Sequence, residues 1–589
     1  MTSGELVTHS DRQPTFALLL GAAWLLAAIQ LLAQNWADTA LTLADTDDAM
    51  RLAQLRDWLG GQGWFDPHQW RVAGGYESHW SRLIDAGLAG TLWIFGWFAE
   101  PALAERLMRT TWPMLWLLPA MAGTAAIAWR IAGREAALVA LLLAVVGLPA
   151  LYQFRPGRID HHNVQIALSV LAVAATVWSD RIRWTAAAAG VVTGLALAIG
   201  LECFPYLLVC GAAFALRHVL DPKGAQAASD YGLALAASSL AGFLVIVGPD
   251  HWTRGLCDQI AVNWIALTVI GGVGLALTAR FTSERKSARL AHVLIAGAAA
   301  TALFVAIEPR CLRGPYAMMD AAVWSIWLAH VREMKPLLTL LAADPLTAIA
   351  IATFPAVALI AALVLARDPG LRRDLGFLVA TAAFVVASIT TFAAIKTSSY
   401  ATWLGMPLVA VFALHLFKLM RLQSLVPRAA VGVLLTPAVL SLGAITIANA
   451  AGIGREDHFH RSETPICFQN QSYAALAQLP AGVVATDVNY GPFVLALTPH
   501  TVLTAPYHRL AAAIVATHRA LAAPPDQARG MLAAFQAGYV AVCGAQAPDG
   551  LSQVERDASL WGRLQGGAVP GWLQPLPLPG PFAVYRVKP

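Results

Sequence analysis

Long apolar runs alternate with short polar loops along the first three quarters of this 589-residue chain. A helix crosses a bilayer with about 17–25 predominantly apolar residues. We expect thirteen such helices, near residues 15–34, 111–129, 136–152, 164–179, 184–201, 204–219, 229–248, 260–279, 288–307, 345–366, 375–394, 401–419 and 428–450. The pattern therefore predicts a mainly α, polytopic membrane protein.

The composition agrees with this pattern. Hydrophobic residues make up 58% of the chain, charged residues 13%, and the mean hydropathy is +0.59. Because soluble domains carry about 25% charged residues, this composition excludes an ordinary soluble protein. The first apolar run, 15–34, is too long for a cleavable signal peptide and has no small-residue cleavage site after it. We therefore expect it to remain as the first span.

Lysine and arginine are concentrated in alternate loops, such as 279–290 and 366–374. Basic loops belong in the cytoplasm, so the other loops face outward. The outward set includes the long loops 35–110 and 308–344. With an odd number of spans, the N-terminus is cytoplasmic and the C-terminal tail is periplasmic, as in a bacterial-type inner membrane. The apolar stretch 86–98 is short, and we expect it to form a helix packed within the first outer loop.

The chain thus divides into a transmembrane domain, 1–452, and a soluble tail, 453–589. Short strand-like runs in the tail alternate with helical patterns, which predicts a small extracytoplasmic α/β domain. The expected strands lie at 481–488, 501–506, 538–544 and near the C-terminus, and the expected helices at 471–479 and 526–538, the second ending at Gly538.

Four of the six cysteines fall in the outward set. In an oxidising compartment they suggest two disulfides, Cys257–Cys311 and Cys467–Cys543. The sequence does not fix this connectivity, and four unpaired buried thiols are the alternative.

Ionisable residues gather at the outer ends of the spans, where carboxylates are costly and usually functional. Asp45, Asp47 and Asp48 follow the first span, and "FRPGRIDHHNVQ" (154–165) lies between two later spans. The candidate site residues are Asp48, Arg155, Arg158, Asp160, His161, His162, Glu202, Glu333 and Lys396. Converging carboxylates indicate a metal site or an acid–base site.

Each candidate also has a structural interpretation. The aspartates at 45–48 can cap the helix that follows them. His161 and His162 can pack at the membrane interface, Glu333 can be solvated, and Glu202 can serve as an internal hydrogen-bonding group.

The order of these features resembles the GT-C glycosyltransferases, specifically the catalytic subunit of oligosaccharyltransferase. That family has an Asp-Pro-x-x-x-Tyr-Arg stretch running into Tyr-Leu after its first span, and "DAMRLAQLRDWL" matches its length, with Asp48 as the aspartate. "GRIDHHN" is similar to Gly-x-x-Asp-Asn-Glu, with Asp160 as the aspartate and His162 in the glutamate position. "HVRE" is similar to Ser-Val-x-Glu, with Glu333 as the glutamate.

The resemblance implies transfer of a sugar or glycan from a polyprenyl-linked donor in the membrane lipid to a saccharide, lipid or protein acceptor, with no nucleic-acid partner. Asp48, Asp160 and Glu333 would be catalytic, with Asp48 as the base and inversion at the anomeric centre. The same three residues and His162 would hold a divalent metal, Mn²⁺ or Mg²⁺.

This chain departs from the family in two further places. The Trp-Trp-Asp-Tyr-Gly element is absent from the tail, which argues against an asparagine acceptor. The phosphate-binding arginine near the twelfth span is also missing, so Lys396, with Arg155 and Arg158, is the candidate for the donor phosphate.

Two other classes stay open. A lipid-linked saccharide transporter or flippase would place its charges at mid-membrane in broken helices, whereas most charge clusters here lie at outer span ends. A non-catalytic assembly subunit would explain the altered motifs.

Overall fold

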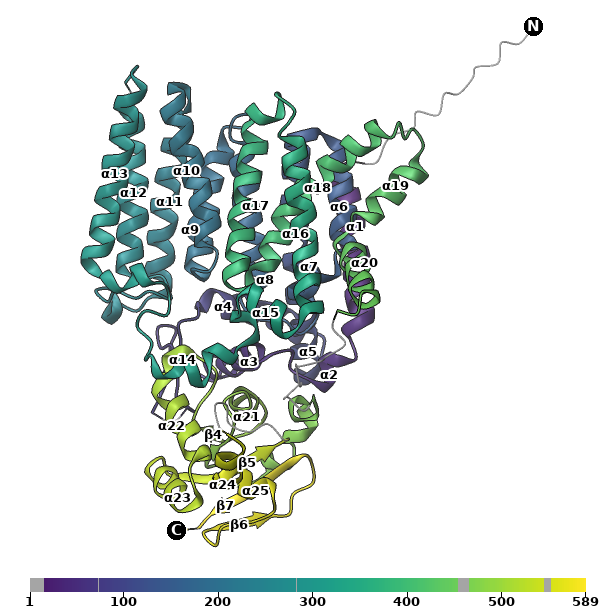
Figure 1. The fold of residues 1–589 in the computed structure, drawn as a ribbon. Coiled ribbons are helices and arrows are strands. Elements are labelled where there is room, and N and C mark those ends of the chain that lie inside the picture. The colour runs from purple at the N-terminus through teal and green to yellow at the C-terminus, as the bar shows by residue number, and fades with distance from the viewer. Residues whose placement is uncertain (1–14, 73, 282, 454–464, 545–551, 589) are drawn as a thin grey trace.

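The computed structural model describes residues 15–72, 74–281, 283–453, 465–544 and 552–588. A bundle of long helices forms one end of the molecule and a sheet with short helices forms the other (Figure 1). The cytoplasmic N-terminus that we expect, residues 1–14, lies outside the described residues.

Every predicted span is helical. The bundle contains α1 (Phe16–Asn35), α5 (Pro101–Ala132), α6 (Arg134–Val145) with α7 (Leu148–Leu151), α8 (His162–Trp178), α9 (Trp184–Ile199), α10 (Phe204–Leu220), α11 (Ala225–Ile246), α12 (Val262–Arg280), α13 (Lys286–Ile307), α16 (Pro345–Leu365), α17 (Leu375–Ala393), α18 (Ser398–Leu419), and α19 (Leu425–Leu434) with α20 (Pro437–Ala450). This helical architecture with a small C-terminal sheet confirms the predicted fold class.

The number of membrane crossings stays a prediction. Within the described residues, eight helices are long and apolar enough to span a bilayer. The bent pair α19 and α20, at 59°, makes a ninth. Pro437 begins α20, and proline breaks helical hydrogen bonding at such a bend. Helices α8, α9 and α10 are apolar but shorter, with 16–17 residues each.

Several short elements lie between the bundle and the tail (Figure 1). They are α2 (Asp38–Leu41), α3 (Thr46–Leu59), the hairpin β1 (His68–Gln69) and β2 (Tyr76–Glu77), α4 (Arg82–Gly96), α14 (Ala322–Ile326) and α15 (Leu337–Ala343). The apolar stretch expected to form a helix in the first outer loop belongs to α4, whose Ser81 side chain accepts a hydrogen bond from the Leu83 N–H.

The tail contains a five-stranded sheet in the order β4-β3-β5-β7-β6. Strand β3 pairs in parallel with β4 and β5, whereas β7 pairs antiparallel with β5 and β6. Its elements are β3 (Val483–Ala485), α21 (Gly491–Leu497), β4 (Thr501–Val502), α22 (Ala511–Ala522), α23 (Pro525–Ala534), β5 (Ala537–Cys543), α24 (Gln553–Ala558), α25 (Leu560–Gln565), β6 (Leu573–Leu576) and β7 (Phe582–Val587).

Two local predictions in the tail are wrong. The expected helix at 471–479 is a pair of 3-10 turns, Asn470–Tyr473 and Leu476–Gln478, where side-chain bonds from Ser472 and Tyr473 to backbone carbonyls hold the chain. The second helix ends at Ala534 rather than at Gly538, because the chain must enter β5 at Ala537 to pair with Val483. Gln536 adopts the left-handed conformation there, with φ 55°.

Both suggested disulfides are present. Cys257 is bonded to Cys311, and Cys467 to Cys543, while Cys203 and Cys210 are buried free thiols in the bundle.

The thirteen-span arrangement predicts that the turn near Arg285 and the C-terminus lie on opposite sides of the membrane. The turn between α12 and α13, near Arg285, lies at the end of the bundle away from the tail (Figure 1). A tag inserted there should be protected in sealed, right-side-out vesicles, whereas a C-terminal tag should be labelled by an impermeant reagent. Labelling of both tags from the same side would contradict the thirteen-span arrangement.

Candidate active site

A cavity of about 1250 Å³ lies where one end of the helical bundle faces the tail. Its walls come from the start of α3, the loop before α8, the segment 316–335, the turn Ile395–Thr397 and several tail segments. Eight of the ionisable residues named in the sequence analysis line this cavity. They are Asp45, Asp47, Arg158, His161, His162, Glu202, Glu333 and Lys396.

The three aspartates at the start of α3 have different surroundings. Asp45 is the N-cap, and its side chain accepts a hydrogen bond from the Thr46 N–H. Asp47 and Asp48 follow in the first turn, where successive side chains point about 100° apart. Asp47 therefore lines the cavity, while Asp48 is buried at 1% exposure.

Asp48 holds the loop that precedes α8. Its Oδ1 accepts hydrogen bonds from the Ile159 N–H at 2.6 Å and the Asp160 N–H at 3.0 Å. Burial raises the pKa of Asp48 to about 7, against the opposing effect of Arg158. The carboxylate thus positions the backbone that carries Asp160.

Arg158 joins the carboxylates of both segments. Its guanidinium, 2% exposed, donates to Asp45 at 2.8 Å, lies 3.1 Å from Asp48 and donates to Asp160. Gly157 makes the turn before it with φ 99°, a conformation that favours glycine. Burial acts to raise the pKa of Asp160, but Arg158, His162 and His161 together hold that pKa at about 2.

The beginning of α8 adds histidine ligands to this wall. The backbone N–H of His162 donates to Asp160 Oδ1 at 3.0 Å, and His162 Nδ1 lies 3.2 Å from Glu202 Oε2. The other Glu202 oxygen accepts from Lys396 Nζ. Although burial acts to raise the pKa of Glu202, Lys396 and His162 hold it well below its usual range.

Two groups of residues here could hold a metal ion. The ligand atoms of Asp47, Asp160 and His162 lie within 4.8 Å of one another, as do those of His161, His162 and Glu202. Desolvation, with the nearby charges of Asp45 and Glu333, raises the pKa of Asp47 well above its usual value. A cation beside Asp47 would relieve this crowding of negative charge.

The sequence identified this region but not every side chain. It selected Asp48, whereas the structure brings Asp47 together with Asp160 and His162. Glu333, in the turn Arg332–Met334, lines the same cavity. Arg155 instead stacks on Tyr152, 4.2 Å from the ring centroid, and is not among the described residues that line the cavity.

His161 lies beside His162, with ring centroids 4.5 Å apart, and its Nδ1 is buried without a hydrogen-bond partner. The sequence did not show that α3 begins at Thr46. That starting residue decides which aspartate side chain faces the cavity.

The chain has the fold of the GT-C membrane glycosyltransferases, and the resemblance to oligosaccharyltransferase is confirmed at the level of fold. The archaeal oligosaccharyltransferase AglB from Archaeoglobus fulgidus, solved with an inhibitory peptide and a dolichol-phosphate, matches 90% of this chain and 69% of its own, with a TM-score of 0.63 and 14% identity. An Archaeoglobus fulgidus oligosaccharyltransferase in the apo form matches with a TM-score of 0.64 and 15% identity, over 89% of this chain and 69% of its own.

A structure of the same Archaeoglobus fulgidus enzyme with Zn and sulfate gives a TM-score of 0.58 at 14% identity, over 89% of this chain and 68% of that one. No protein-family model and no curated protein match the sequence.

Arg158 gives a direct test of how the site is held together. Arg158→Ala would leave three carboxylates without their shared cation, and removing one partner of a buried ion pair costs about 3–5 kcal/mol. We expect a large drop in thermal stability in detergent. Arg155→Ala is the matched control, because the Arg155 contact with Tyr152 is worth about 1 kcal/mol or less. Equal losses in both variants would contradict this account.

Proposed function

We propose that the protein is a glycosyltransferase that moves a sugar or glycan from a polyprenyl-phosphate-type lipid carrier to an acceptor at the extracytoplasmic membrane face. The observation that carries this proposal is the cavity at the outer end of a GT-C bundle, where Asp47, Asp160 and His162 converge. Cavities with convergent polar groups and perturbed pKa values are candidate active sites.

The donor would enter with its lipid chain between the bundle helices and its phosphate in the cavity. Lys396 lies in the cavity wall, where it donates to Glu202, and is our candidate cation for that phosphate. Arg158 is engaged by three carboxylates, so we assign it to holding the site together. Arg155 donates to the Tyr152 hydroxyl and does not line the cavity, so it would contact the phosphate only as the donor enters.

A divalent ion fits the donor set of Asp47, Asp160 and His162, since carboxylate and imidazole together suit Mn²⁺ and related ions. When bound, it would neutralise charge that builds on the leaving phosphate. Glu202 lies against His162 Nδ1 and fixes the ring orientation, as carboxylates beside metal-binding histidines do.

The acceptor needs a group that orients it or takes its proton. Asp47 and Glu333 both line the cavity, whereas Asp48 is buried and its Oδ1 accepts two backbone N–H groups. We therefore move the base from Asp48 to Asp47. A single displacement without a covalent enzyme intermediate would invert the anomeric centre. The acceptor would be a saccharide, a lipid or a protein, presented from the periplasmic side.

Asp47→Asn and Asp160→Asn test the chemistry directly. Each should lower turnover by about 10²-fold or more, the scale of lost acid–base or charge stabilisation. Purified protein in lipid nanodiscs would be given polyprenyl-linked sugars and candidate acceptors, with products read by mass spectrometry. Asp526→Asn, on the exposed surface of α23, is the control and should keep full activity. Full activity in both cavity variants would place the site elsewhere.

His162→Glu tests the metal. It exchanges imidazole for oxygen, so an active variant should shift its preference toward Mg²⁺. His518→Glu is the comparison, because His518 lines the cavity but belongs to neither candidate metal group there, so its substitution should leave the preference unchanged. Turnover of the native protein that survives excess chelator would refute the metal while leaving the transferase proposal standing.

A further inference from the structure

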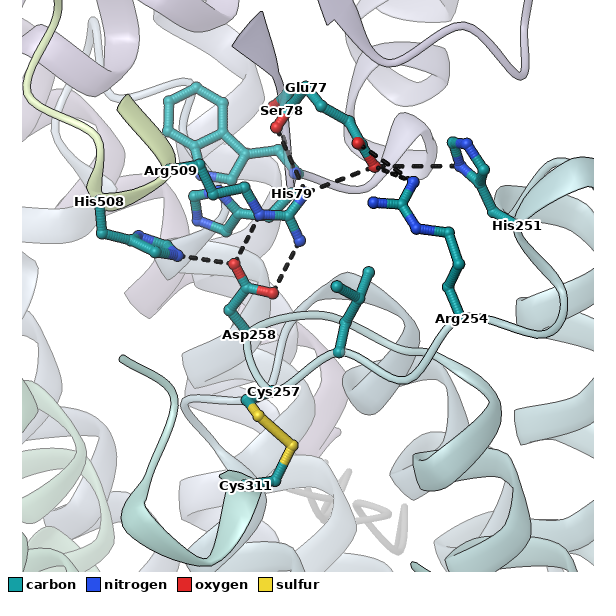
Figure 2. A network of polar contacts seen from close by, with 12 residues as sticks. Glu77, Ser78, His79, His251, Arg254, Cys257, Asp258, Cys311, His508 and Arg509 are labelled. Carbon is teal, nitrogen blue, oxygen red and sulfur yellow. Dashed lines mark hydrogen bonds and ion pairs between the residues drawn. A yellow bond between two sulfur atoms is a disulfide. The ribbon is translucent and has the colours of Figure 1, made fainter. Parts of the chain in front are cut away.

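A second cluster lies where three segments that are distant in the sequence meet (Figure 2). His79 comes from the first outer loop, Asp258 from the loop between α11 and α12, and His508 from the tail. Their ligand atoms lie within 4.8 Å of one another, and His79 and His508 line the cavity. This cluster shares no residue with the groups around His162.

The three side chains are already oriented toward a common point. His508 Nε2 lies 2.6 Å from Asp258 Oδ2, and the His79 and His508 rings are 4.7 Å apart. The Tyr76 hydroxyl lies 3.3 Å from His79 Nδ1. If Nδ1 donates to Tyr76, the His79 Nε2 lone pair is available to a metal, which is how outer hydrogen bonds set histidine ligands.

We propose that His79, Asp258 and His508 form a zinc-binding site, with the ion replacing the proton between His508 and Asp258. Two imidazoles and one carboxylate are a common zinc donor set, and three protein ligands leave a fourth position for water or substrate. That position would open toward the cavity, because both histidines line it.

Arg509 is the strongest argument against a cation here, since it holds both oxygens of Asp258 at 2.7 Å. Its charge is partly offset by Glu77, whose carboxylate lies 3.7 Å from Arg509 and 3.2 Å from Arg254. A carboxylate offers about four lone-pair sites, so three hydrogen bonds do not saturate it. Arg509 therefore serves as the outer partner that orients Asp258, and affinity depends on both imidazoles.

The loop that carries Asp258 is fixed independently of any metal. Cys257, its neighbour, is bonded to Cys311 at the end of α13 (Figure 2). Zinc would then fasten the tail and the first outer loop to this anchored loop, beside the space where an acceptor would bind. The ion would both stabilise the composite wall and offer a ligand position within it.

Zinc binding to the intact, chelator-stripped protein in detergent tests the proposal without an activity assay. Zinc content after dialysis, and titration followed by calorimetry, should show two sites. One is this cluster, and the other is the divalent-ion site of the proposed function. His79→Ala and His508→Ala should each weaken one site by about 100-fold or more, since loss of outer partners alone costs 10–100-fold. His518→Ala removes another histidine of the cavity wall and should bind zinc like the native protein.

Cobalt substitution adds a spectroscopic readout, because the visible absorption of the ion at this site should disappear in His79→Ala. That variant leaves the Asp258 contacts with His508 and Arg509 in place, so folding is preserved. Zinc binding unchanged in both histidine variants would overturn the proposal. Binding lost in these variants but unchanged in Asp47→Asn would support this site and refute the catalytic metal of the proposed function.

Discussion

The buried guanidinium of Arg158 is the interaction on which the candidate site depends. A cation removed from water must be compensated by charge and hydrogen bonds. Here three aspartates supply that compensation, two from the start of α3 and one from the loop before α8. Because these segments are separated by more than a hundred residues, the ion pairs fix how the first outer loop meets the second. The wall of the cavity is built on this junction.

The neighbouring carboxylates at this junction make different contacts. Asp48 uses one oxygen for two backbone N–H groups and lies beside Arg158 with the other. Asp160 binds Arg158 with one oxygen and the N–H of His162 with the other. Asp47 makes no such contact among the described residues, and its side chain lines the cavity. Carboxyl groups can therefore gather at this end of the bundle because Arg158 and backbone N–H groups hold Asp45, Asp48 and Asp160.

Hydropathy predicted the helical bundle because a bilayer imposes a simple rule on span length. The cysteines predicted both disulfides. Asp160, His162, Glu202 and Lys396 could be selected because ionisable groups at span ends are few. The choice between Asp47 and Asp48 could not, since it depends on the residue at which α3 begins. Arg158 carries the sequence signature of a phosphate ligand, and only the tertiary structure shows the aspartates around it.

Residues of the tail line the cavity together with residues of the bundle. The Val502 N–H of edge strand β4 donates to the Arg71 carbonyl at 2.9 Å, so the first outer loop covers an edge that would otherwise be exposed. The Tyr507 hydroxyl donates to the Thr46 carbonyl at 3.1 Å, beside Asp47. Arg509 binds Asp258 in the histidine cluster. Because tail residues touch both the acidic wall and the histidine cluster, any acceptor in the cavity would contact the tail and the bundle together, and the tail would share in choosing it.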